Sequence, residues 1–213
     1  MTETTEKPPD FLQISIDMTL YRGQRCAKAI LQLDPNISEI DENDLAFGYN
    51  VGSGADVVAF KELGFKRAIV TNNQGFLYRS FNSTSADREK KALDSILEHF
   101  SPKETQFSLF ELSDCVKVKS FSPRLVTILG MEPSCFSEDG TLEYADDILM
   151  ISKQNPKATI VLSAYCDHPL SDKAFVDFSN RLDKVGVNHQ LFIDIDRPEV
   201  GVLGERILAI KGI

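Results

Sequence analysis

LAFGYNVGSGADVVAFKELGFKRAIVT, the stretch from Leu45 to Thr71, contains two short apolar runs separated by a glycine loop and a helical pattern. The apolar runs at its two ends are expected to form buried strands. Gly52 and Gly54 allow the close backbone approach and positive φ angles of a tight strand-to-helix turn. The apolar spacing over 55–63 predicts a helix that follows this turn. A strand–helix–strand unit predicts two parallel strands in one sheet.

The same alternation continues along the chain. Further strands are expected at 107–112, 125–130 and 158–164, and helices at 85–100, 142–153 and 172–185. The last two strand candidates, 188–195 and 206–211, are joined by a short loop. A parallel crossover usually needs a dozen or more residues, so these two strands are expected to pair antiparallel. The sequence therefore predicts an α/β fold with three layers, in which a mostly parallel seven-stranded sheet ends in a C-terminal antiparallel hairpin.

The N-terminal part of the chain does not belong to this alternation. A polar tail, 1–10, precedes a helical pattern over 17–33 in which Gly23 is the weak point. We expect two parts, an N-terminal tail and helical lid over 1–43 and a main domain over 44–213. A helix that simply packs on the sheet explains the N-terminal pattern equally well.

Composition and charge restrict the class of protein. Hydrophobic residues make up 42% of the 213 residues and the net charge is −9, which argues against nucleic acid as an obligatory partner. The four cysteines lack the paired spacing of a zinc site or a disulfide framework, which favours free thiols in a reducing compartment. No secretory signal and no apolar stretch of membrane-spanning length is apparent, so we expect a cytoplasmic protein without membrane segments.

The glycine loop has two rival interpretations that the surrounding residues disfavour. A dinucleotide fingerprint needs a small residue where Val57 stands and an acidic residue at the end of the second strand, where Asn72 follows Thr71. A phosphate-binding P-loop needs a Gly-Lys-Ser/Thr sequence that does not follow Gly54. An ordinary tight turn without a ligand is a third reading of the loop.

From residue 44 to residue 213 the order of elements, with the terminal hairpin, resembles that of the class I S-adenosylmethionine-dependent methyltransferases, which have a Rossmann-like sheet. FGYNVGSGADVVAFKELG is similar to the first motif of that family, and FSPRLVTILGM, residues 121–131, to the motif of its fourth strand. The resemblance implies that the cofactor is S-adenosylmethionine and that its methionine part lies along the glycine loop, its ribose near Asn72 and its adenine near Asp114. The cofactor-binding residues implied in this way are Asn50, Gly52, Ser53, Gly54, Asn72, Asp114, Cys115 and Gly130.

Two positions depart from the family pattern. The family usually has Asp or Glu at the end of the second strand, where a carboxylate accepts both ribose hydroxyls, and this chain has Asn72. The segment 122–124 also replaces the usual acidic residue before the fourth strand. These departures fit either a divergent active enzyme or a domain that has lost its cofactor.

Candidate catalytic residues lie in the loops expected beyond the fourth and fifth strands. His168 could act as a general base for an acceptor that must lose a proton, with Tyr165 in the same stretch. Glu132 would face the transferable methyl group on the resemblance. A polar strand-to-helix loop is the structural alternative for Tyr165 to His168. The expected acceptor is a small molecule or a protein group, and a catalytically inactive interaction or regulatory module and another nucleotide-binding Rossmann-like enzyme are the competing hypotheses. The oligomeric state is not indicated.

Overall fold

The strands of this protein form one central sheet. The computed structural model describes residues 10–49, 51–72, 84–109, 122–131, 145–165, 169–194 and 205–211. Within these ranges the sheet has seven strands in the order β3-β2-β1-β4-β5-β7-β6. All strand pairs are parallel except those of β7, which runs antiparallel to both β5 and β6. The predicted α/β sheet with a C-terminal antiparallel hairpin is therefore confirmed. The strands are β1 (Leu45–Gly48), β2 (Arg67–Asn72), β3 (Glu104–Leu109), β4 (Leu125–Met131), β5 (Thr159–Tyr165), β6 (His189–Asp194) and β7 (Glu205–Lys211).

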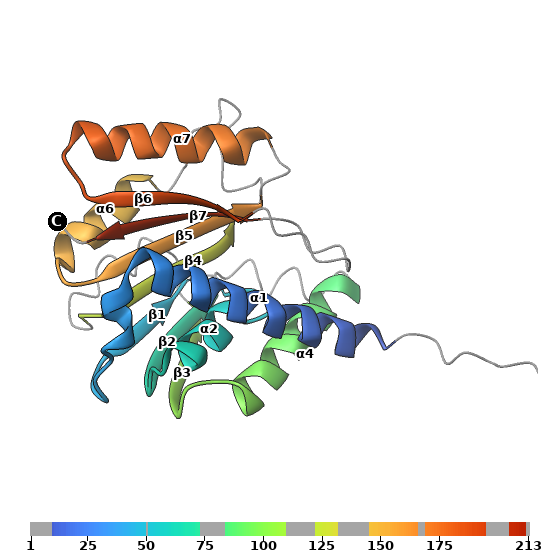
Figure 1. The fold of residues 1–213 in the computed structure, drawn as a ribbon. Coiled ribbons are helices and arrows are strands. Elements are labelled where there is room, and N and C mark those ends of the chain that lie inside the picture. The colour runs from blue at the N-terminus through green and yellow to red at the C-terminus, as the bar shows by residue number, and fades with distance from the viewer. Residues whose placement is uncertain are drawn as a thin grey trace, which may run out of the picture.

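Helices cover both faces of the sheet (Figure 1). One face carries α1, α2 and α4, and the other face carries α6 and α7. Among the described residues, no helix is long and apolar enough to cross a membrane. The helices are α1 (Phe11–Leu33), the short 3-10 helix η1 (Pro35–Ser38), α2 (Ala55–Leu63), α4 (Thr84–His99), α6 (Ala145–Gln154) and α7 (Pro169–Lys184).

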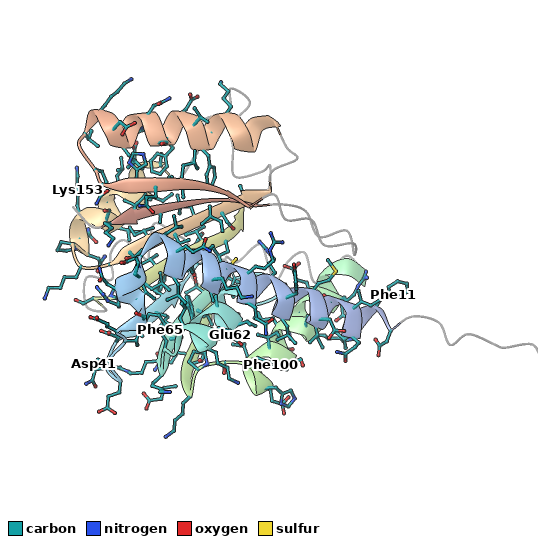
Figure 2. All side chains as sticks on the ribbon, viewed as in Figure 1. Phe11, Asp41, Glu62, Phe65, Phe100 and Lys153 are labelled. Carbon is teal, nitrogen blue, oxygen red and sulfur yellow. The ribbon has the colours of Figure 1, made fainter. Side chains whose placement is uncertain are left out.

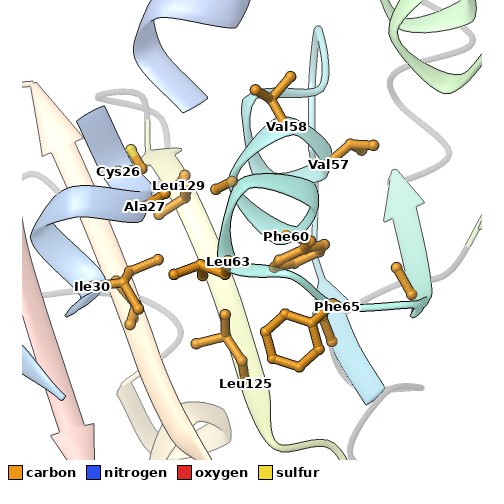
Figure 3. Close-up of a cluster of buried hydrophobic side chains, with 14 of the residues drawn as sticks. Cys26, Ala27, Ile30, Val57, Val58, Phe60, Leu63, Phe65, Leu125 and Leu129 are labelled. Carbon is orange, nitrogen blue, oxygen red and sulfur yellow. The ribbon is translucent and has the colours of Figure 1, made fainter. Parts of the chain in front are cut away.

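Two apolar cores lie between these layers, because successive strand residues point to opposite faces. Leu45 and Phe47 of β1 belong to the core beneath α6 and α7, whereas Ala46 between them belongs to the core beneath α1, α2 and α4. Figure 3 shows the second of these cores, in which side chains of α1 and α2 meet those of β4. Continuous burial of the strands on both faces explains why their sequences are apolar runs rather than alternating patterns.

Helix α1 begins earlier than the predicted start at residue 17. The Asp10 carboxylate caps it by accepting hydrogen bonds from the backbone N–H groups of Leu12 and Gln13, at 3.0 and 3.2 Å. The C-terminal half of α1 is buried against α2, with Gly23 at the point of closest approach. Its N-terminal end extends beyond the sheet and carries the exposed side chain of Phe11 (Figure 2).

Strand β3 also begins earlier than predicted, at Glu104 rather than at Phe107. It is an edge strand that pairs only with β2 within the described ranges, so its outward positions can be polar. Phe107, which looked like the start of a buried run, is 42% exposed. An edge strand therefore weakens the apolar signal by which central strands are recognised.

Asp34, directly after α1, links this helix to the far end of the chain. Its carboxylate accepts hydrogen bonds from the Thr159 hydroxyl and from Lys211 Nζ, the latter at 2.8 Å. The backbone N–H of Asn36 donates to the same carboxylate at 3.3 Å. Burial would raise the pKa of Asp34, but the hydrogen bonds from Lys211 and Thr159 and the positive charge of Lys211 outweigh burial and lower the pKa below its ordinary value.

Candidate functional site

The glycine loop, residues 51–54, lies where the strand order reverses on the two sides of β1. The backbone N–H of Val51 donates to the carbonyl oxygen of Thr71 in β2, at 3.0 Å. On the other side, the N–H of Tyr49 donates to the carbonyl oxygen of Thr127 in β4, at 2.9 Å. Ligands of open α/β sheets bind beyond the carboxyl ends of the strands at such a switch point. The position of the loop therefore marks it as the candidate binding site.

Asp56 in the first turn of α2 fixes the helix that follows the loop. Its Oδ1 atom accepts a hydrogen bond from the hydroxyl of Thr127, at 2.5 Å, and its side chain is buried. A carboxylate in the first turn also interacts favourably with the positive end of the helix dipole. Asp56 thus joins the start of α2 to β4 and is committed to the interior rather than to a ligand.

Gly52 and Gly54 have positive φ angles of 51° and 101°. A methyl group built on Gly54 would lie 3.0 Å from the Ile96 side chain and 3.1 Å from that of Leu93 in α4. The resemblance to methyltransferases led us to expect Gly54 against a cofactor. In the structure the missing side chain of Gly54 points toward α4, so packing and backbone conformation by themselves require glycine there.

We expect Gly54→Ala to lower the free energy of unfolding by about 2 kcal/mol, because a positive φ angle and a crowded methyl group act together. Gly64 supplies the matched control, since it has a φ angle of 94° and nothing within 4 Å of an added methyl group. Gly64→Ala should cost only the backbone part, about 1 kcal/mol. Urea unfolding of both variants measures the difference, and equal losses would show that α4 does not crowd Gly54.

Asn72, the last residue of β2, contacts the glycine loop directly. Its Oδ1 atom accepts a hydrogen bond from the backbone N–H of Gly52, at 3.0 Å. Its Nδ2 atom is buried and has no hydrogen-bond partner among the residues that the structure describes. A buried amide donor without a partner costs free energy, and such a cost is removed when a ligand supplies an acceptor. Asn72 therefore holds the loop with one end of its amide and leaves a donor with the other.

Two further side chains reach the loop from helices, and neither was predicted from the sequence. The hydroxyls of Thr19 in α1 and Ser53 in the loop are hydrogen-bonded at 2.9 Å. From α4, the Oε1 atom of Glu89 lies 2.8 Å from the position of a methyl group built on Gly52. Glu89 precedes Leu93 by one helical turn, so it belongs to the same face of α4 that packs against Gly54. That spacing was the available signal.

The remaining predicted site residues are placed only in part. Gly130 lies in β4 near its carboxyl end, and Tyr165 is the last residue of β5. Both positions are on the edge of the sheet where the glycine loop lies, because these strands are parallel to β1. The other predicted residues, Asn50, Asp114, Cys115, Glu132 and His168, lie outside the described residues.

Solved structures share this arrangement of elements, although the sequence itself matches no family model and no curated protein. An rRNA methylase from Streptococcus thermophilus superposes with a TM-score of 0.51 and 10% identity over 84% of this chain and 93% of that one. Precorrin-6y C5,15-methyltransferase from Geobacter metallireducens GS-15 has a TM-score of 0.51 and 10% identity, covering 100% of this chain and 93% of the other. The methyltransferase domain of bacterial CtHen1 has a TM-score of 0.51 and 12% identity, covering 90% and 99%. The chain has the Rossmann-like fold of the class I S-adenosylmethionine-dependent methyltransferases.

Proposed function

We propose that this protein binds S-adenosylmethionine at the glycine loop and transfers its methyl group to an acceptor. The observation that carries the proposal is the unpartnered, buried Nδ2 donor of Asn72 beside a glycine loop at the switch point of the sheet. The described residues fit such a ligand. Gly52 allows close backbone approach, and helix α2 begins at Gly54 without a side-chain cap, which leaves backbone donors at its start.

Each part of the site has a role in this proposal. The bound cofactor supplies an electrophilic methyl group on a sulfonium. Residues of the glycine loop bind and orient it, and the predicted contacts of Asn50, Asp114, Cys115 and Gly130 complete its binding site. Displacement at a methyl carbon depends mainly on alignment, so a base is needed only for an acceptor that carries a proton. Glu132, Tyr165 and His168 are the residues proposed to contact the acceptor or to receive that proton.

The acceptor is proposed to be a small molecule or a protein group. Proteins with this fold include an rRNA methylase and a precorrin methyltransferase, so the fold by itself does not select the acceptor. A net charge of −9 gives little attraction for the phosphates of RNA, which favours the other two classes. Helix α1 reaches the loop through the contact between Thr19 and Ser53, and this contact supports its proposed role as a lid beside the site.

An inactive interaction module is the second candidate function. The observation that favours it is Asn72 itself, because an uncharged amide stands at the strand end where the related enzymes usually have a carboxylate. Such a module would keep the sheet and the loop without useful affinity for the cofactor. Cofactor affinity therefore separates the two candidates.

The test is calorimetric titration of the full chain with S-adenosylmethionine and S-adenosylhomocysteine. We expect dissociation constants in the micromolar range for the wild type. Asp114→Ala should weaken both by about tenfold, since it removes a charge-assisted hydrogen bond. Asp177→Ala removes an exposed carboxylate of α7 and serves as the control. A folded wild type that binds neither compound would contradict the methyltransferase proposal and favour the interaction module.

A further inference from the structure

The ribose of an adenosyl group presents two neighbouring hydroxyls that act as hydrogen-bond donors. Such a pair is held best by an ionised acceptor, because charge-assisted hydrogen bonds are shorter and stronger than neutral ones. The end of β2 does not supply one. The Oδ1 atom of Asn72 already accepts from Gly52, and its free Nδ2 atom can only donate. Recognition of the hydroxyl protons must therefore come from another element.

Helix α4 brings a carboxylate to the same place. Glu89 Oε1 lies 2.8 Å from the methyl position on Gly52, the residue whose N–H group is bound by Asn72. The packing of Leu93 and Ile96 against Gly54 fixes the face of α4 on which Glu89 stands. The Glu89 side chain is half-buried, so it is held against the loop and still reaches solvent or a ligand.

Within the described part of the chain, the other carboxylate at this end of α2 is that of Asp56. It is buried and accepts a hydrogen bond from Thr127 beneath the helix, which directs it away from the surface of the loop. Asp87 in the first turn of α4 forms an exposed ion pair with Lys91 at 2.7 Å. Glu89 is thus the carboxylate among these three that contacts the glycine loop from the outside.

We propose that Glu89 accepts the ribose hydroxyls of the adenosyl cofactor and so replaces, from α4, the acidic residue that the end of β2 lacks. This inference rests on the proposed function. It makes Glu89 a residue that determines specificity for a ribonucleoside ligand. It also gives Asn72 a distinct task, since its amide fixes Gly52 and donates to a hydroxyl oxygen while Glu89 accepts the hydroxyl proton.

The test compares two ligands against two proteins by calorimetric titration. The ligands are S-adenosylhomocysteine and its 2′,3′-dideoxyribose analogue, and the proteins are the wild type and Glu89→Gln. The wild type should bind S-adenosylhomocysteine about tenfold to a hundredfold more tightly than the analogue. Glu89→Gln should bring the two affinities to within about threefold of each other. Glu98→Gln changes an exposed glutamate at the other end of the same helix and should leave the ratio unchanged.

The inference is overturned if Glu89→Gln keeps the wild-type ratio between the two ligands. It is also overturned if Glu89→Gln weakens S-adenosylmethionine much more than S-adenosylhomocysteine, because the carboxylate would then face the sulfonium rather than the ribose. Circular dichroism of each variant shows that the sheet is retained. Failure of the wild type to bind S-adenosylhomocysteine contradicts the proposed function itself, which distinguishes that outcome from failure of the Glu89 assignment.

Discussion

Gly23→Ala is expected to lower the free energy of unfolding by about 3 kcal/mol, the upper end of the range for an overpacked core. A methyl group on Gly23 would lie 2.5 Å from Val58 Cβ and 2.7 Å from the carbonyl oxygen of Ala55. Both atoms are fixed by the backbone of α2, so neither can move aside without shifting the helix. Alanine favours an α-helix over glycine by only about 1 kcal/mol, which does not offset the clash.

Urea unfolding at neutral pH measures this loss, with Gln24→Ala as the matched control. Gln24 is the next residue of α1 and is exposed, so its replacement should change the free energy of unfolding by no more than about 0.5 kcal/mol. Stabilisation by Gly23→Ala, as helix propensity alone dictates, would mean that α1 and α2 do not cross at Gly23. The feature that looked like a weak point of the helix is the position that allows the helix to be there.

Asp34→Ala is expected to cost about 3 kcal/mol at neutral pH, because removing one partner leaves buried polar groups unsatisfied. Thr159 is buried and would lose the acceptor of its hydroxyl, and Lys211 would lose its ion pair. Lys211 is partly exposed, so water replaces some of that interaction. Replacement of the exposed Asp177 by alanine is the control and should have little effect.

The cost of Asp34→Ala should depend on pH in one direction. The pKa of Asp34 is lower in the folded protein than its ordinary value, so the folded state favours the ionised carboxylate. Its contribution to stability is therefore present in full above the ordinary pKa and is lost as the pH falls through the folded-state pKa. The difference between wild type and Asp34→Ala should shrink below about pH 4. A difference that grows on acidification would contradict the assigned charge state.

The elements that could be predicted are those encoded by local pattern. The helix predicted at 55–63 has those limits in the structure, because the glycine loop precedes it and Gly64, with a positive φ angle, ends it. The antiparallel pairing of β6 and β7 also followed from the sequence, since a short connection excludes a parallel crossover. The start of β3 was missed by three residues because an edge strand need not be apolar on both faces.

The candidate site was predictable only where it is contiguous in sequence. Gly52, Ser53 and Gly54 stand together in one motif and were found as a group. The Thr19 hydroxyl meets Ser53 across 34 residues of chain, and nothing near Thr19 indicates the contact. Glu89 resembles an ordinary surface residue of a helix until the packing of Leu93 against Gly54 shows which way its face of α4 points. Tertiary packing rather than motif chemistry positions these two residues.

The hydrogen bonds that hold the glycine loop also fix the moment at which the site can form during synthesis. The loop depends on β4, through the backbone of Thr127 and through the bond between Thr127 and Asp56, which spans 71 residues. Pairings of such long sequence separation form late, because the intervening chain must first be ordered. A nascent chain that ends before β4 contains the whole motif without the bonds that shape it. During synthesis the protein therefore has the sequence of its binding loop long before it has a loop that can bind.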